Sequence, residues 1–119
     1  MRTANFFFPR TYRITKKKDF DRVYQSSHCR RTKHLSIHTI PNDLNNCRIG
    51  LSVSKKVGNA VFRNLLKRSI REAFRHLQQD LPSGYDIVVT VHSPEKMSLS
   101  EYQHELISTL KEHDLKWKK

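Results

Sequence analysis

Residues 54–76 read SKKVGNAVFRNLLKRSIREAFRH, and this stretch decides the fold because it predicts one long helix with two different sides. When the residues are placed at roughly 100° intervals, the apolar side chains gather on one side of the helix. These side chains are Phe62, Leu66, Ile70, Ala73, Phe74 and Leu77. We expect this side to be buried, with Gly58 and Asn59 before the helix and its end near residue 79.

The other side of this helix carries positive charge. Its cations sweep an arc of about 140° on the same helical wheel. They are Arg63, Lys67, Arg68, Arg71 and Arg75. A basic arc is usually a solvated surface, but Glu72 is the only acid in the stretch, so most of the i,i+4 ion pairs that neutralise such a surface are missing. The arc therefore predicts a polyanionic partner.

The whole chain is strongly basic, which favours a nucleic acid as that partner. Its 119 residues include 23 Lys and Arg against 11 Asp and Glu, a formal net charge of +12 and an isoelectric point near 10.1. An anionic membrane surface is the second choice. The longest apolar runs, residues 6–8 and 87–89, are far shorter than the roughly 20 residues of a spanning helix, and no signal peptide is recognisable. We expect a cytoplasmic protein.

The sequence offers no catalytic or metal-binding constellation. Its seven histidines are scattered, and His34 and His38 would lie roughly 13 Å apart along a strand, too far for one metal ion. No nucleophile with a matched base and no phosphate-binding loop is present. Cys29 and Cys47 lack a C-x-x-C spacing and are predicted to be free thiols. We expect no catalytic residue and no metal or cofactor bound by the protein alone.

The remaining segments predict a single domain, residues 1–119, with residues 1–14 as an extended tail. A short helix is expected at about residues 16–25. Alternating strands at residues 35–40 and 49–54 flank a polar turn and are expected to pair as a hairpin.

Beyond the basic helix, residues 86–92 are apolar enough for a central strand. Ser98 and Glu101 form a capping box for a last helix, whose stripe of Tyr102, Leu106 and Leu110 should be buried. The order αββαβα predicts an α+β fold with helices packed on one small sheet.

Residues 48–74, RIGLSVSKKVGNAVFRNLLKRSIREAF, resemble the signature region of the bacterial ribonuclease P protein subunit, whose hallmark is an Arg-Asn-Arg motif in a basic helix. The segments KKKDFDRVY and YDIVVTVHS fall where that family has its first helix and a later strand. The resemblance covers nearly the full chain and implies the ribonuclease P protein fold, which is ribosomal protein S5 domain 2-like.

This resemblance implies an accessory role in removing the 5′ leader from precursor tRNA. In the family, the RNA subunit is the ribozyme and uses Mg²⁺ held by RNA and substrate. The protein binds the catalytic RNA and the single-stranded leader, and so broadens the range of precursors that are processed. The implied partners are these two RNAs, with no DNA and no membrane.

The resemblance also assigns ribozyme-binding residues. Arg63 and Asn64 match the first two residues of the motif, and Leu65 stands where its second Arg is expected. Further cations at the motif and just before the helix complete the expected ribozyme-binding set: Lys55, Lys56, Lys67, Arg68, Arg71 and Arg75. Because a phosphate-dominated footprint is spread over many cations, RNA binding should survive the change at Leu65.

Leader recognition in the family uses a concave surface between the sheet and the first helix. Phe20 and Tyr24 match aromatic positions of that surface, and His38 stands where relatives can carry a Tyr. Base stacking on such rings is tolerant of sequence. Core packing is the competing interpretation of Phe20 and Tyr24.

Two other functions share these features. A ribosomal-protein-like structural RNA-binding protein would have the same charge and size, and only the motif at residues 54–76 separates the two. A sequence-specific DNA-binding module is disfavoured, since the basic helix lacks the partner helix of a helix-turn-helix.

Overall fold

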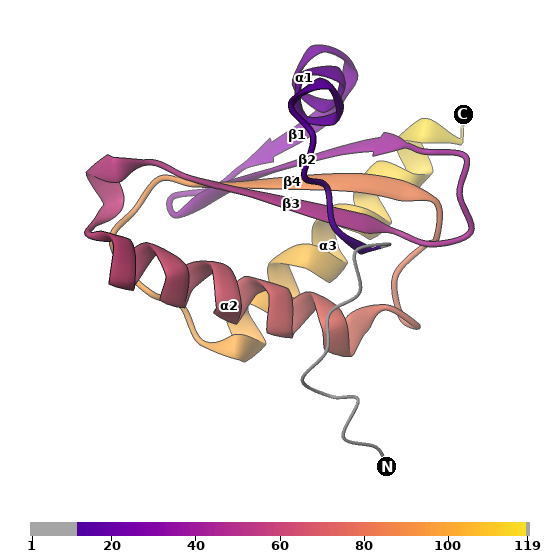
Figure 1. Ribbon diagram of the computed structural model, residues 1–119. Coiled ribbons are helices and arrows are strands. Elements are labelled where there is room, and N and C mark those ends of the chain that lie inside the picture. Colours follow the sequence, from indigo (N-terminus) through magenta and orange to yellow (C-terminus); the bar gives the residue numbers. More distant parts are fainter. Residues whose placement is uncertain (1–11, 119) are drawn as a thin grey trace.

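The computed structural model describes residues 12–118, which fold into one four-stranded sheet with helices on both faces (Figure 1). Helix α1 (Lys17–Ser26) lies on one face, and α2 (Ala60–Leu77) and α3 (Leu99–Trp117) lie on the other. The strands are β1 (His28–Arg31), β2 (Leu35–Pro41), β3 (Arg48–Val53) and β4 (Tyr85–Val91). The predicted α+β class, with helices on one small sheet, is confirmed.

The predicted hairpin between residues 35–40 and 49–54 is wrong, because β4 lies between these two strands. The sheet order is β1-β2-β4-β3, with β4 antiparallel to β2 and parallel to β3. Strand β4 is buried at every position except Thr90. The backbone N–H and C=O groups of a strand buried this deeply need hydrogen-bond partners on both edges. Placing β4 between β2 and β3 provides them, and this outweighs direct pairing of β2 with β3 across the turn at residues 42–46. Its predicted central place is confirmed.

Strand β1 was not predicted, and it makes the order αβββαβα. Its four residues, HCRR, alternate between half-buried and exposed and contain no aliphatic side chain. The strand exists because it pairs antiparallel with β2, with Cys29 opposite His38 and Arg31 opposite Ser36. Tertiary pairing therefore creates a strand that has no hydrophobic alternation to reveal it.

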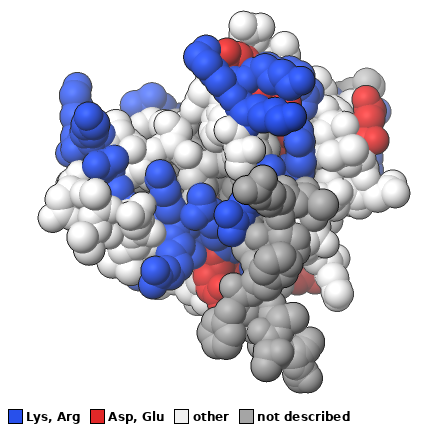
Figure 2. All heavy atoms as spheres, in the orientation of Figure 1, with Lys and Arg blue, Asp and Glu red and all other residues white. Residues whose placement is uncertain are grey.

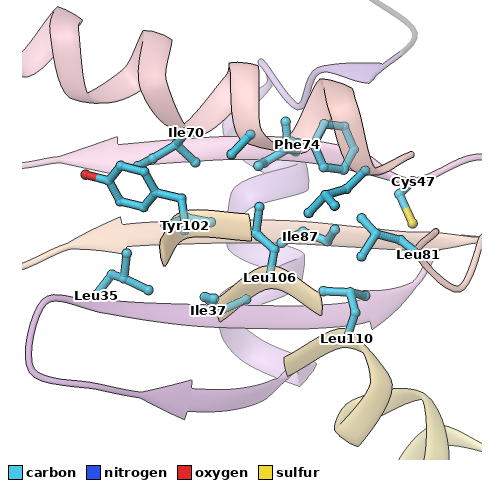
Figure 3. Packing of buried hydrophobic residues seen from close by; sticks show 14 of the residues in the cluster. Leu35, Ile37, Cys47, Ile70, Phe74, Leu81, Ile87, Tyr102, Leu106 and Leu110 are labelled. Carbon is cyan, nitrogen blue, oxygen red and sulfur yellow. The ribbon is translucent and has the colours of Figure 1, made fainter. Parts of the chain in front are cut away.

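The main core lies between the sheet and helices α2 and α3 (Figure 3). On the predicted apolar side of α2, five residues are buried there and Phe62 is half-buried, and the predicted stripe of α3 is buried. Asn59 caps α2 by accepting a hydrogen bond from the backbone N–H of Phe62 at 2.9 Å. The capping box of Ser98 and Glu101 is also present. Helix α2 ends at Leu77, two residues before the expected limit.

A smaller core holds α1 on the opposite face. It consists of Ile14, Val23, Ile40 and Val88, with Phe20 packed against it. Gly50 makes room for Phe20, because a Cβ at this position would lie 2.7 Å from the Phe20 ring. Residue 14, the end of the predicted tail, is therefore buried, and its N–H bonds to the carbonyl of Ile49. Arg13 also pairs with Ile49 in an isolated β-bridge, and residues 1–11 of that tail lie outside the described residues.

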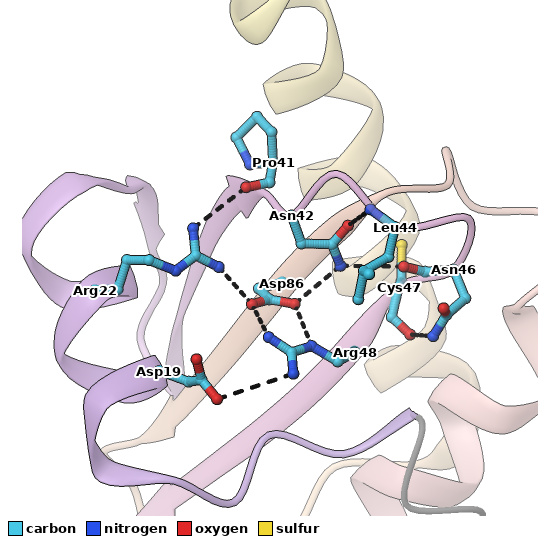
Figure 4. Close-up of polar contacts among 9 residues, drawn as sticks. All are labelled: Asp19, Arg22, Pro41, Asn42, Leu44, Asn46, Cys47, Arg48 and Asp86. Atoms are coloured by element: carbon cyan, nitrogen blue, oxygen red, sulfur yellow. Dashed lines mark hydrogen bonds and ion pairs between the residues drawn. The ribbon is translucent and has the colours of Figure 1, made fainter.

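An ion cluster around Asp86 fastens α1 to the sheet (Figure 4). The Asp86 side chain is fully buried and accepts hydrogen bonds from Arg22 of α1 at 2.6 Å and from Arg48 of β3 at 2.8 and 2.6 Å. Asn42 donates a further bond at 2.9 Å. Burial alone would raise the pKa of Asp86, but the hydrogen bonds from Arg48 and Asn42, with the charges of Arg48 and Arg22, lower it. Asp86 is therefore ionised at neutral pH.

Within residues 12–118, no helix has the length and apolar character needed to cross a membrane.

Candidate nucleic-acid interface

The predicted cations of residues 54–76 form one basic surface on α2 and the turn before it. Lys55 and Lys56 are exposed on a short 3-10 helix, η3 (Lys55–Val57), rather than at the end of a strand. Figure 2 shows Lys and Arg side chains gathered over η3, α2 and α1 on the face it views. We call the cations on η3 and α2, together with Asn64 between them, the basic arc: Lys55, Lys56, Arg63, Asn64, Lys67, Arg68 and Arg71.

Most of the basic arc has no carboxylate to neutralise it. Among the residues that the structure describes, no acid forms an ion pair with Arg63, Lys67 or Arg68. Arg63 donates instead to the carbonyl of Gly58 at 3.1 Å, which steadies the start of α2. Burial, and then the positive charge of Arg13, lower the pKa of Arg71. Crowded cations of this kind favour an anionic ligand, because it relieves their repulsion.

Arg75 differs from the other predicted cations. Its guanidinium donates two hydrogen bonds to the Glu72 carboxylate, at 3.1 and 2.5 Å, and His76 lies 3.1 Å from the same group. The hydrogen bond from Arg75 is the main cause that lowers the pKa of Glu72. The one acid of the helix therefore neutralises the C-terminal end of the predicted surface, and we leave Arg75 out of the basic arc.

Leu65 lies exposed at the edge of this surface. Its side chain is 42% accessible, and on the helical wheel it falls about 60° beyond Arg68, outside the charged arc. Val61, one turn earlier, is 80% accessible. The position expected to carry the second Arg of the motif is therefore open to a ligand, although the residue there brings no charge.

The three residues predicted for leader binding come together in space. Tyr24 of α1 lies edge-on to His38 of β2, with ring centroids 5.1 Å apart, and 6.5 Å from the ring of Phe20. We call these three residues the aromatic cluster. The Tyr24 hydroxyl also lies 3.4 Å from the hydroxyl of Thr90 on β4. Three segments distant in sequence, α1, β2 and β4, thus meet at this site.

Within the aromatic cluster, the rings have different surroundings. Phe20 packs against the small core and over Gly50, as the core-packing interpretation requires. Tyr24 is 45% accessible, so its ring can take a stacked base. Burial, and then the charge of His92, lower the pKa of His38. His38 is therefore a neutral ring at physiological pH, with its nitrogens 3.3 Å from Ser27 Oγ and 3.9 Å from Cys29 Sγ.

Sequence reasoning missed the residues that hold this site in place. Arg22 and Arg48 belong to the Asp86 cluster and are committed to a protein carboxylate. Thr90 and His92 lie on the same face of the sheet as the aromatic cluster, but nothing in the strand pattern set them apart. Only the register of β2 and β4 brings them beside Ser36 and His38. No local signal could have found them.

The family model for ribonuclease P matches residues 8–114. The chain belongs to the ribonuclease P protein family. A ribonuclease P protein component from Staphylococcus aureus strain Mu3 is 40% identical over 104 residues, which are 86% of this chain and 90% of that protein.

Solved ribonuclease P proteins share the fold. One from Staphylococcus aureus is 36% identical with a TM-score of 0.73, over 86% of this chain and 96% of that one. One from Thermotoga maritima is 28% identical with a TM-score of 0.74, over 84% and 96%. The resemblance seen in residues 48–74 is therefore confirmed over most of the chain.

Ribonuclease P is a tRNA-processing endoribonuclease whose catalysis resides in its RNA subunit, and this family supplies the protein component. The chemistry therefore needs no catalytic side chain from this chain. Across residues 12–118, no group of three or more His, Cys, Asp or Glu side chains could hold a metal ion. Cys29 is exposed, Cys47 is buried, and both are free thiols as predicted.

Proposed function

We propose that this chain binds the catalytic RNA of ribonuclease P through the basic arc and the 5′ leader of precursor tRNA through the aromatic cluster. It thereby strengthens precursor binding and broadens the range of precursors that the ribozyme processes. The observation that carries this proposal is the open Tyr24 ring. It meets His38 and Thr90 from two strands, on the opposite face of the sheet from α2.

The basic arc suits a structured RNA because it offers cations without a fixed pattern of base contacts. Exposed Arg68 and Asn64 and half-buried Arg63 lie along one helix. Lys55 and Lys56 precede the N-terminus of α2, where backbone amides also favour phosphate. Such a footprint gives affinity through many phosphate contacts, with strong salt dependence.

The aromatic cluster suits a single strand because an unpaired base exposes both faces for stacking. A ring such as Tyr24 contributes about 1–3 kcal/mol per stacked base. Because Arg22 and Arg48 are held by Asp86, their guanidinium groups are not free to add charge. Leader binding here should therefore depend on stacking more than on phosphate contacts.

The proposal also covers the metal, the cellular location and the partners of the reaction. Mg²⁺ is held by the RNA subunit and the substrate rather than by this protein, and the holoenzyme works in the cytoplasm. The partners are the ribozyme and the precursor leader, not DNA and not a membrane. Because catalysis in this family resides in the RNA subunit, we expect the Mg²⁺ that serves it to be bound by RNA and substrate.

The decisive experiment reconstitutes the purified chain with a bacterial ribonuclease P RNA at low Mg²⁺. The substrate is a precursor tRNA that carries a leader, and the measurement is the rate of correct 5′ cleavage. We expect clear stimulation over the RNA alone. No stimulation would contradict the proposal and favour a structural RNA-binding role instead.

Competition binding separates the remaining alternative. Labelled ribozyme RNA bound to the chain is challenged with unlabelled ribozyme RNA or with duplex DNA. We expect the RNA to compete at much lower concentration. Equal competition by duplex DNA would indicate a general duplex-binding protein.

A further inference from the structure

A band of polar side chains crosses all four strands on the face that carries α1. The strand register places Arg31 of β1 opposite Ser36 of β2, Ser36 opposite Thr90 of β4, and Thr90 beside Ser52 of β3. Paired residues of neighbouring strands point to the same face of a sheet. We call these four residues the polar band.

The contacts of its members fix the face to which the polar band belongs. Leu35 and Ile37, on either side of Ser36, are buried in the main core, so Ser36 points to the α1 side. Thr90 meets the hydroxyl of Tyr24 from α1. Ser36 Oγ lies 2.6 Å from His92 Nε2. Burial, and then the positive charge of Arg31, lower the pKa of His92.

Arg30 and Arg31 are neighbours in sequence with opposite surroundings. Arg30 points to the α3 side, where its guanidinium lies 3.7 Å from Glu112. Arg31 is exposed, and within residues 12–118 no acid pairs with it. The cation on the α1 side is therefore the one that remains available to an anion.

The polar band runs between two groups of cations, one at each edge of the sheet. Beyond Ser52, the chain leaves β3 and enters η3, which carries Lys55 and Lys56 of the basic arc. Arg31 lies at the other edge of the sheet, three strand spacings, or about 14 Å, from Ser52. Between them, Thr90 lies beside the open Tyr24 ring. A single strand lying over the aromatic cluster would pass Thr90 and then the hydrogen-bonded pair of the buried Ser36 and His92 on its way towards Arg31.

We propose that Arg31 is a phosphate-binding residue for the part of the leader that lies farthest from the basic arc. This inference rests on the proposed leader binding and extends it to a second contact on β1. Arg31 would set how much leader the protein senses, because nucleotides that end at the aromatic cluster do not reach it. An Arg suits this role because its planar group can donate two hydrogen bonds to one phosphate.

The test measures how holoenzyme affinity depends on leader length. Precursor tRNAs whose leaders lengthen one nucleotide at a time are bound to holoenzymes that carry the wild-type chain, Arg31→Gln or Arg30→Gln. Arg30→Gln removes the same charge from the opposite face and is the matched control. Arg31→Lys keeps the charge, so it should retain most of the binding. Circular dichroism and ribozyme affinity report on folding.

We expect Arg31→Gln to match the wild type for the shortest leaders and to bind the longest leaders several-fold more weakly. Its salt slope for long leaders should fall by about one, as for one lost phosphate contact. Arg30→Gln should follow the wild type at every length. If Arg31→Gln and Arg30→Gln bound leaders of every length equally well, the role of Arg31 would be wrong, while the proposed leader binding would stand. If the affinity of the wild type did not rise with leader length, the proposed leader binding would be wrong as well.

Discussion

The Asp86 cluster and helix α2 use their arginines in opposite ways. In the cluster, Arg22 and Arg48 are locked to the buried carboxylate of Asp86. On α2, Arg63 and Arg68 have no acid among the described residues, and Arg75 is neutralised by Glu72. The same residue type thus holds the protein together in the cluster and remains available to a partner on most of α2.

Under the proposed function, this difference predicts two kinds of RNA contact. The basic arc is a charged surface from one continuous segment, so its binding should depend strongly on salt. The aromatic cluster is a neutral surface assembled from α1, β2 and β4, so its contribution should depend on rings and on the placement of α1. Variants that disturb one face and spare the other can test the comparison.

The largest effect is expected from Asp86→Ala. The change leaves the guanidinium groups of Arg22 and Arg48 without their buried carboxylate, which typically costs about 3–5 kcal/mol. The free energy of unfolding, measured in urea, should fall by that amount. Asp21→Ala is the control on α1, since it removes only the exposed pair with Lys17 and should leave the free energy of unfolding almost unchanged.

The same cluster predicts the sign of a pH dependence. Because the folded pKa of Asp86 is lowered, its contribution is complete above about pH 4, the ordinary range of an Asp. That contribution is lost as the pH falls through the folded pKa. Urea unfolding at a series of acidic pH values should show a steeper loss for the wild type than for Asp86→Ala. Parallel curves would contradict the role of the cluster.

The second effect concerns the basic arc. Arg68→Gln with Arg71→Gln should weaken ribozyme association and lower the salt slope by about two, one for each lost phosphate contact. The preference for precursor over mature tRNA should remain. Affinity measured across a range of salt concentrations checks this. An unchanged slope would show that these residues do not face RNA.

The third effect concerns the aromatic cluster. Tyr24→Ala should reduce the preference for leader-bearing precursor over mature tRNA by about 1–3 kcal/mol, the size of one stacking contact. The salt slope and the stability should change little, because the ring is half exposed. Binding of both tRNAs to the reconstituted holoenzyme is the measurement.

Phe20→Ala is the partner experiment within the cluster. Phe20 packs on the small core and over Gly50, so its loss should mainly lower the free energy of unfolding, by about 2 kcal/mol. If Phe20→Ala abolished leader preference with no loss of stability, the ring would be a leader contact rather than part of the core.

The smallest expected effect is an increase in ribozyme affinity. Leu65→Arg restores the cation expected at the second Arg of the motif, on a side chain that is already exposed. Ribozyme affinity should rise a few-fold, with a salt slope steeper by about one. Leu115→Arg adds the same charge on α3, at another exposed position, and controls for net charge. Equal gains from both variants would mean that position 65 is not special.

The sequence predicted the α2 surface well because a helix keeps its pattern within one segment. The buried side of α2, its Asn59 cap and the capping box at Ser98 all follow from local spacing, and the structure confirms them. Charge and motif also identified the family correctly. The basic arc is visible in sequence because every member lies within residues 54–76.

The α1 side was harder to predict because it is built by pairing between distant segments. The hairpin was wrong because nothing local shows that β4 enters between β2 and β3. Strand β1 has no apolar alternation, so Arg31 was not singled out. Asp86 looked like the polar start of a strand, and only the tertiary structure brings Arg22 and Arg48 to it. The aromatic cluster was predicted from family resemblance rather than from periodicity.

The most direct test of the account compares how three forms of the chain bind two tRNAs in the reconstituted holoenzyme. The wild type, Tyr24→Ala and the Arg68→Gln, Arg71→Gln double variant are each assayed for precursor and mature tRNA over a range of salt concentrations. We predict that Tyr24→Ala loses leader preference at an unchanged salt slope, whereas the double variant loses slope and keeps the preference. If both variants lost the same property to the same extent, the two faces would not divide the work, and the central claim would be contradicted.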